Sequence, residues 1–573
     1  MNEKKRVLVV GLDGATFEII RPMVKAGKLP NFARLIREGS FGPLESSMPP
    51  ITPAAWTSFA TGKDPSKHGL YDFQLHEGDP EKKKQVNSTF VKAKALWKIL
   101  TEAGKRSIVI DVPLTYPPEE INGVLISRVM APDKKNCAYP KALYQKLIRD
   151  GFIEKSEENM AKKHGADKAN KEEEKKPRKV SVKRRQMSKL KQIEKTFRHM
   201  LKAIDKNVEL ASSLMKKEDW DFFMVVFMEA DHAGHGFWRY QAKVRRIYEK
   251  LDEAVGKLFE LAGPDTIKFI MSDHGFTFIP YSFNINEWLY EKGLLAVKLE
   301  VPKKDSMKEL KSFVKNIGNK SGAVFIKGLN KKLKPFSRNA PDDSALRILP
   351  KFRYAIATDY TRSKAYLQSG TSYGVRINLE GRDKTGIIRK GEYNSFRDAL
   401  IRDLRKVKHP MTGGPVFSKI FKKEEVYSES PLGTDPSPDI FMLTPEMKIM
   451  MEGQFSQKRT MRTKMFRKMS PGYGFHHTHG IFFASGREIK DSPELSPKIT
   501  DLAPTILHIL GVPVPEDMDG RILKEIFAPG SGYTSRKVQY QGSSMIEKDK
   551  AASYSKKDET KIKKRLEALG YIE

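Results

Sequence analysis

The chain has 573 residues, 39% of them apolar, and a formal net charge of +33. Its length allows a large core, in one elaborated domain or in several. Its single cysteine, Cys137, excludes an internal disulfide framework and fits a reducing compartment.

The chain shows no sign of secretion or of membrane insertion. Residues 1–6 (MNEKKR) pass directly into an apolar run, and no window approaches 18 uninterrupted apolar residues. We therefore expect a cytoplasmic protein without a transmembrane segment. The basic charge is spread widely and peaks around residues 175–185. It is compatible with binding to nucleic acid or to an anionic membrane surface, and equally with solvated lysine-rich faces.

The first 130 residues alternate between strand and helix patterns. The apolar run 7–10 is typical of a strand buried on both faces, and Asp13 follows it. A helix is predicted with Thr52 as its N-cap, Pro53 as its first helical residue and Gly62 as its end. Its unpaired N–H groups would make a phosphate site beside the Thr52 hydroxyl, which a metal or a base could activate as a nucleophile. A helix at 93–104 and a strand at 107–112 follow.

Two further strands are predicted in the middle of the chain, after a long helix at 189–217. The strand at 222–227 precedes Asp231 and His235, and the strand at 267–271 precedes Asp273 and His274. Together with the first strand they deliver three aspartates to one edge of a sheet, where open α/β sheets place their chemistry. A carboxylate with an imidazole next to it or four positions later can bind one divalent ion.

The remaining segments complete the predicted organisation. Residues 285–470 mix short strands and helices and are interpreted as an α+β cap. A strand at 480–485 is expected to run antiparallel to its neighbours, or its preceding loop crosses back to the active edge, and a short helix is expected at 561–569. We divide the chain into a catalytic domain formed by 1–150, 189–284 and 471–530, a charged and mobile insertion at 151–188, the cap at 285–470, and a polar tail at 531–573.

At this point the motifs carry a resemblance. The segments VLVVGLDG, ITPAAWTSFATGKDPSKHG, DHAGH, SDHGF and GFHHTHGIFFASG resemble, in order and spacing, the type I phosphodiesterase/nucleotide pyrophosphatase branch of the alkaline phosphatase superfamily. The similarity extends from residue 6 to about residue 525. It implies an alkaline-phosphatase-like, three-layer α/β fold with a mostly parallel central sheet.

The resemblance also implies a site with two divalent metal ions, for which zinc suits the ligands and manganese is tolerated. One ion would be held by Asp13, Thr52, Asp273 and His274, and the other by Asp231, His235 and His476. His476 is chosen because it stands four residues before Gly480; His477 and His479 compete with it, and His232 is placed outside the ligand set. Thr52 would be the catalytic nucleophile.

The chain departs from the family at one position. Related pyrophosphatases carry an asparagine shortly after the His-Gly pair, whereas His68-Gly69 is followed here by Leu70-Tyr71-Asp72-Phe73. The context of Cys137 also argues against sulfatase relatives. We expect a phosphodiesterase or nucleotide pyrophosphatase acting on a small phosphate ester or nucleotide. The alternatives are a phosphomonoesterase, phosphonate hydrolase or phosphotransferase of the same superfamily, and a non-catalytic protein that binds nucleic acid or anionic lipid.

Overall fold

The computed structural model describes residues 5–76, 78–132, 135–153, 182–300, 355–427, 436–455, 465–491, 494–546 and 553–569. Most of the predicted mobile insertion, residues 154–181, and part of the predicted cap, residues 301–354, lie outside the described residues.

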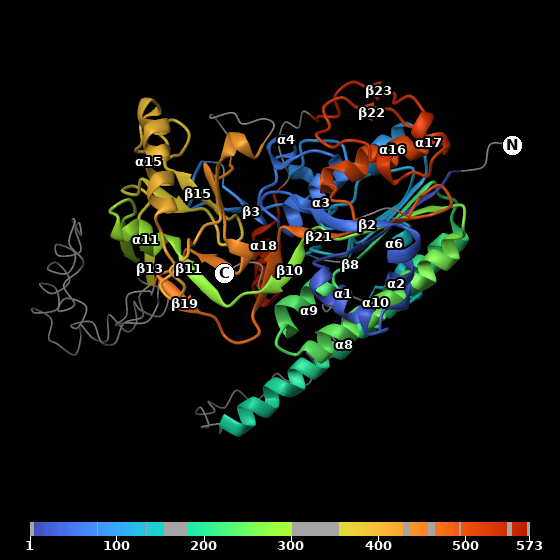
Figure 1. Ribbon diagram of the computed structural model, residues 1–573, viewed down its shortest axis with the longest axis horizontal. Coiled ribbons are helices and arrows are strands. Elements are labelled where there is room, and N and C mark those ends of the chain that lie inside the picture. Colours follow the sequence, from blue (N-terminus) through green and yellow to red (C-terminus); the bar gives the residue numbers. More distant parts are fainter. Residues whose placement is uncertain are drawn as a thin grey trace, which may run out of the picture.

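A mixed sheet of eight strands forms the centre of the larger half of the molecule, on the right in Figure 1. Five neighbouring strands are parallel, and the α/β class predicted from the sequence, with a mostly parallel sheet, is confirmed. The strand order is β2 (Ser40–Glu45), β21 (His479–Ser485), β9 (Ile267–Met271), β1 (Val7–Leu12), β8 (Phe222–Phe227), β5 (Ser107–Ile110), β6 (Gly123–Ile126) and β7 (Ala138–Tyr139).

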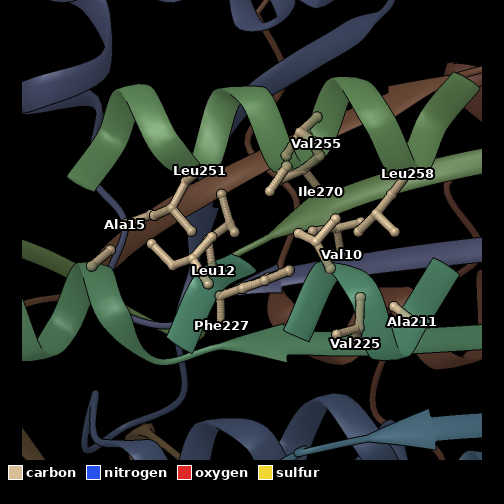
Figure 2. Packing of buried hydrophobic residues seen from close by; sticks show 14 of the residues in the cluster. Val10, Leu12, Ala15, Ala211, Val225, Phe227, Leu251, Val255, Leu258 and Ile270 are labelled. Carbon is tan, nitrogen blue, oxygen red and sulfur yellow. The ribbon is translucent and has the colours of Figure 1, made fainter. Parts of the chain in front are cut away.

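The apolar runs form strands because both faces of the sheet are covered. In β1, Leu8, Val10 and Leu12 belong to the core on one face, while Val7 and Val9 belong to the core on the other. Figure 2 shows Val10, Leu12, Val225, Phe227 and Ile270 packed under Leu251, Val255 and Leu258 of helix α10 (Gln241–Ala262). Alternation along each strand therefore builds a three-layer structure.

Two groups of helices make the outer layers (Figure 1). One layer contains α1 (Phe17–Lys25), α2 (Pro30–Glu38), α6 (Leu143–Arg149), α8 (Val182–Lys217), α9 (Glu229–Phe237) and α10. The other contains α3 (Thr52–Thr61), α5 (Leu96–Glu102), α16 (Leu502–Leu510) and α17 (Gly532–Ser535). The long helix α8 begins seven residues before the predicted position 189.

The sheet order brings the chemically active segments to one edge. Strand β1 lies between β9 and β8 and is parallel to both, so that the carboxyl ends of these three strands are adjacent. Strand β21 is antiparallel to β9 and to β2, which confirms the predicted antiparallel direction of the strand at 480–485. The residues that precede β21 consequently arrive at this same edge.

A second half, on the left in Figure 1, has its own core and is called the cap below. Its helices are α11 (Ile285–Glu291) and α15 (Tyr393–Arg405). Its sheets are β14 (Ala365–Leu367), β15 (Gly374–Ile377), β17 (Ile440–Leu443) and β16 (Lys419–Lys422); β18 (Ile449–Glu452), β11 (Tyr281–Asn284) and β19 (Phe466–Lys468); and β12 (Val297–Glu300) with β13 (Ala355–Thr358).

Short elements connect the two halves and close the chain. They are the antiparallel pair β10 (Gly275–Phe278) and β20 (Gly474–His477), the pair β3 (Gln74–Leu75) and β4 (Lys84–Gln85), the pair β22 (Val514–Pro515) and β23 (Tyr540–Gln541), helix α4 (Pro65–His68) and the C-terminal helix α18 (Lys556–Leu569). Helix α18 starts five residues earlier than predicted. In the described part of the chain, no helix is long and apolar enough to cross a membrane.

Candidate metal centre

Asp13 lies directly after β1 and is fixed there by its backbone. Its N–H donates to the carbonyl of Phe227 at the end of β8, at 2.9 Å. The next residue, Gly14, has φ +68°, and a Cβ at this position would lie 2.8 Å from the Cβ of Asp231. A glycine is thus required for the segments after β1 and β8 to approach each other this closely.

The first cluster consists of Asp13, Asp273 and His274, whose potential ligand atoms all lie within 4.8 Å of one another. His274 Nε2 is 3.3 Å from Asp273 Oδ2 and 3.8 Å from Asp13 Oδ1. All three side chains are fully buried. The Asp-His pair after β9 therefore meets the aspartate after β1.

The second cluster consists of Asp231, His235 and His476, which satisfy the same 4.8 Å criterion. Asp231 and His235 lie one turn apart on helix α9, so both side chains are on one face. Asp231 Oδ1 is 3.4 Å from His235 Nε2 and 3.4 Å from His476 Nε2. His476 is contributed by β20, more than 200 residues away along the chain.

The two clusters form one centre. The rings of His274 and His476 are stacked with their centroids 3.8 Å apart. The antiparallel pairing of β10 with β20 produces this approach, because Phe276 pairs with His476 and Gly275 pairs with His477. The carbonyl of Pro50, two residues before Thr52, is 3.2 Å from Nδ1 of His476.

Thr52 lies at the start of α3, but it is the first helical residue and not the predicted N-cap. Ile51 is the N-cap, with extended backbone angles, and its carbonyl accepts from Ala55 N–H at 2.9 Å. The Thr52 side chain consequently makes no capping hydrogen bond. Its hydroxyl is buried and has no hydrogen-bond partner among the described residues. Gly62 ends the helix in the left-handed region, as predicted.

Trp56, one turn after Thr52, ties α3 to the first cluster. Its indole Nε1–H donates to Asp13 Oδ2 at 2.7 Å. Gly11 makes room for the indole, because a Cβ there would lie 2.5 Å from a ring carbon. Trp56 was not among the residues predicted for the site, although its i+4 position relative to Thr52 places both side chains on the same face of the helix.

The donor set fits divalent cations. Within the described chain, Asp13 Oδ1, Asp273 Oδ2 and His274 Nε2 are buried without a hydrogen-bond partner, although leaving such groups unpaired costs about 1–3 kcal/mol each. Burial and the neighbouring Asp273 raise the pKa of Asp13, and burial and Asp231 raise the pKa of Asp273 to about 8. Cations between these carboxylates would relieve both penalties.

Two imidazoles of the centre, those of His274 and His476, are in the protonation state that metal binding requires. Burial lowers the pKa of His274 and that of His476 to about 4, so both rings are neutral near pH 7. Burial alone would raise the pKa of Asp231, but His235 and His476 hold it well below its usual value. The centre therefore combines carboxylate oxygen with imidazole nitrogen, a set that suits zinc or manganese.

The competing histidines lie outside both clusters. The His479 side chain is exposed, and its backbone N–H donates to His477 Nδ1 at 3.1 Å. His232 is on α9 but does not share the face of Asp231 and His235.

The segment after His68-Gly69 does not place an amide at the centre. Phe73 packs against Ile562 and Leu566 of α18. Asp72 accepts hydrogen bonds from Phe73 N–H at 2.7 Å and from the hydroxyls of Ser369 and Thr371 in the cap. Asp72, which lies in the segment where this chain departs from the family pattern, thus connects the cap to this loop.

A cavity of about 280 Å³ lies between this loop and the cap and is called the side cavity below. Asp72 and His76 line it from the loop, and Gln368 and Phe475 line it from the other side. Phe475 directly precedes His476, and its ring centroid is 5.7 Å from that of His235. The side cavity is therefore next to the second cluster.

Both the sequence and the fold are similar to known proteins. The model of the type I phosphodiesterase/nucleotide pyrophosphatase family matches residues 7–481. A search of curated proteins returned no match.

Three similar solved structures illustrate the range of the structural matches. Phosphonoacetate hydrolase from Sinorhizobium meliloti 1021 has 13% identity, coverage of 89% of this chain and 96% of that chain, and a TM-score of 0.48. Murine ectonucleotide pyrophosphatase/phosphodiesterase 5 has 13% identity, coverage of 91% and 100%, and a TM-score of 0.46. The alkaline phosphatase PafA has 15% identity, coverage of 92% and 100%, and a TM-score of 0.47.

Proposed function

Because the chain belongs to the type I phosphodiesterase/nucleotide pyrophosphatase family, a family of hydrolases, we propose that it is a metal-dependent hydrolase of phosphodiester or pyrophosphate bonds. The observation that carries the proposal is the position of Thr52. Its hydroxyl is buried and has no hydrogen-bond partner among the described residues. Thr52 begins helix α3, whose Trp56 is hydrogen-bonded to Asp13 of the first cluster. Two residues before Thr52, the Pro50 carbonyl contacts His476 of the second cluster.

Each residue of the centre has a role in this proposal. The first ion would be held by Asp13, Asp273, His274 and Thr52, and the second by Asp231, His235 and His476. Bound zinc or manganese would supply Lewis-acid stabilisation of the phosphoryl charge and lower the pKa of a coordinated hydroxyl. The positive end of the α3 dipole and its free N–H groups favour a phosphate oxygen at the same place.

Thr52 Oγ1 is the proposed nucleophile. It attacks phosphorus, the alcohol or phosphate leaving group departs with its bonding electrons, and the threonine proton passes to solvent. Water then cleaves the phosphothreonine ester and restores the hydroxyl. Phosphoryl transfer of this kind depends mainly on positioning and on charge neutralisation, which the buried centre is built to provide.

The side cavity favours a diester over a monoester. Its volume of about 280 Å³ next to the second cluster leaves space for a second ester arm, which a phosphomonoesterase does not need. A small phosphate ester or nucleotide derivative is consequently the proposed substrate class.

Hydrolysis of paired chromogenic esters tests the proposal. With zinc or manganese, bis(p-nitrophenyl) phosphate should be cleaved with a higher kcat/KM than p-nitrophenyl phosphate. Thr52→Ala should abolish this activity, and Thr52→Ser should retain part of it. Thr57→Ala is the matched control, because Thr57 is another buried threonine of α3 and lies beside a different cavity. Full activity of Thr52→Ala would contradict the mechanism.

The net charge of +33 has a place in the same proposal. We propose that it attracts anionic substrates, with nucleic acid or an anionic surface as the larger versions of such a ligand. Measured association with a short RNA should then weaken steeply with salt. The cytoplasmic location expected from the composition stays a prediction.

A further inference from the structure

Two residues that line the side cavity, His76 and Gln368, carry buried polar atoms that the proposed chemistry does not use. His76 is 2% exposed, and neither of its ring nitrogens has a hydrogen-bond partner in the described part of the chain. Gln368 is 7% exposed; its Nε2 donates to Pro436 O at 2.6 Å, and its Oε1 is without a partner there. Burying such groups unsatisfied costs about 1–3 kcal/mol each. A ligand that hydrogen-bonds to them would recover this energy.

The walls that carry these atoms are fixed. Asp72 joins the loop to the cap through Ser369 and Thr371, with Thr371 Oγ1 at 3.2 Å from Asp72 Oδ1. On the opposite side, the ring of Phe475 is stacked on His476 with a centroid distance of 4.8 Å. The cavity is therefore preformed beside the second cluster, and one wall offers an aromatic face.

His76 is neutral in this setting. Burial, followed by the positive charges of Arg376, Lys83 and Arg382, lowers the pKa of its imidazole to about 3. The two arginines are held in place by ion pairs inside the cap, Arg376 with Asp383 at 2.8 Å and Arg382 with Asp439 at 2.6 Å. A neutral imidazole offers one N–H donor and one nitrogen acceptor.

The atoms without a partner thus comprise one donor, the N–H of His76, and two acceptors, the other ring nitrogen of His76 and Gln368 Oε1. None of them is charged. An anionic group only accepts hydrogen bonds, and it would face Gln368 Oε1 and the Asp72 carboxylate. An ammonium group only donates, and it would enter the positive field of Lys83 and the two arginines. A hydroxyl group both donates and accepts, so neighbouring hydroxyls match the whole set.

Resting on the phosphodiesterase function proposed above, we infer that the side cavity binds one ester arm of the substrate, and that this arm is a neutral, hydroxyl-rich group such as a sugar or a polyol. His76 and Gln368 are its specificity-determining residues, and Phe475 provides the apolar face against which a ring can lie.

The test uses p-nitrophenyl phosphodiesters that differ only in their second arm: methyl, hexyl, glyceryl, myo-inositol-1-yl and thymidine-5′-yl. We expect kcat/KM to be at least about 10-fold higher for the glyceryl or inositol ester than for the methyl ester, because one satisfied buried polar group is worth a factor of this order. His76→Phe and Gln368→Met should each reduce that ratio about 10-fold.

His409→Phe is the matched control. His409 is a buried histidine of the cap that does not line the side cavity. It should leave the ratio unchanged. Thermal denaturation of each variant verifies its folding. Calorimetry with Thr52→Ala protein and the inositol methyl phosphodiester measures the same preference as binding, without turnover.

The outcomes separate the two proposals. If no ester is hydrolysed by metal-loaded protein, the proposed function fails. If the methyl ester is hydrolysed but the polyol arms bring no gain, or if the hexyl arm is preferred, the inference about the cavity is overturned. A preference for the thymidine arm that depends equally on His76 and Gln368 would assign the cavity to a nucleobase and overturn the inference as well.

Discussion

Replacement of Trp56 by phenylalanine isolates the support that α3 gives to the first cluster. The change removes the 2.7 Å hydrogen bond to Asp13 Oδ2 while keeping an aromatic ring in the core. Hydrogen bonds to charged groups contribute about 1.5–3 kcal/mol, and loss of a group that orients a metal ligand typically costs about 10–100-fold in affinity. The energy range and the affinity range agree, because a tenfold change in affinity corresponds to about 1.4 kcal/mol.

The assay is competition for zinc between the protein and a chromophoric chelator. We expect Trp56→Phe to weaken one of two zinc-binding events by about 10–100-fold and to leave the other nearly unchanged. Trp97→Phe is the control, because Trp97 is equally buried on the same face of the sheet and its Nε1–H donates to Glu119 at 3.2 Å, outside both clusters. Equal zinc affinities for the two variants would refute the reasoning.

Three further predictions concern pH and stability. In metal-free protein the pKa of Asp273 is raised to about 8, against the usual 3.8. Between these two values only the folded state keeps the proton, so stability should fall as pH rises from about 3.8 to about 8 and then level off. Metal loading should remove this fall in a thermal melt. Lys268 is buried on β9, and burial lowers its pKa to about 8. Lys268→Met should therefore stabilise the protein near pH 7 in urea denaturation, and this gain should fade between about pH 8 and about pH 10.5 as the lysine loses its charge. A gain that stays constant with pH would be evidence against a cost of burying the charged lysine. Ile562→Ala and Leu566→Ala should each lower the free energy of unfolding by about 2–5 kcal/mol in the same assay, because both residues pack on Phe73. An unchanged free energy of unfolding would mean that α18 does not pack against Phe73.

The strands and their ends could be predicted because the information is local. Unbroken apolar runs gave β8 and β9 with their observed bounds, and β1 within two residues of its end. The aspartates after these strands meet because parallel neighbours share an edge. The predicted N-cap of α3 was wrong by one residue. A threonine before a proline fits either the N-cap or the first helical position, and only the backbone angles decide between them.

The rest of the centre depends on contacts between distant segments. His476 lies on β20, which pairs with β10 although the whole cap separates the two strands in the chain, and no local pattern predicts that pairing. The side cavity arises where residues 72–76 meet residue 368, which sequence spacing cannot reveal. Order within the cap was equally inaccessible, because its sheets pair β11 with β18 and β19 across more than 150 residues.

Anomalous X-ray diffraction from crystals of the protein grown with zinc tests the central claim most directly. The account predicts two zinc peaks per chain, one bounded by Asp13, Asp273 and His274 and the other by Asp231, His235 and His476, with the Thr52 hydroxyl next to the first. A single peak, or zinc bound only at surface histidines such as His479, would contradict it.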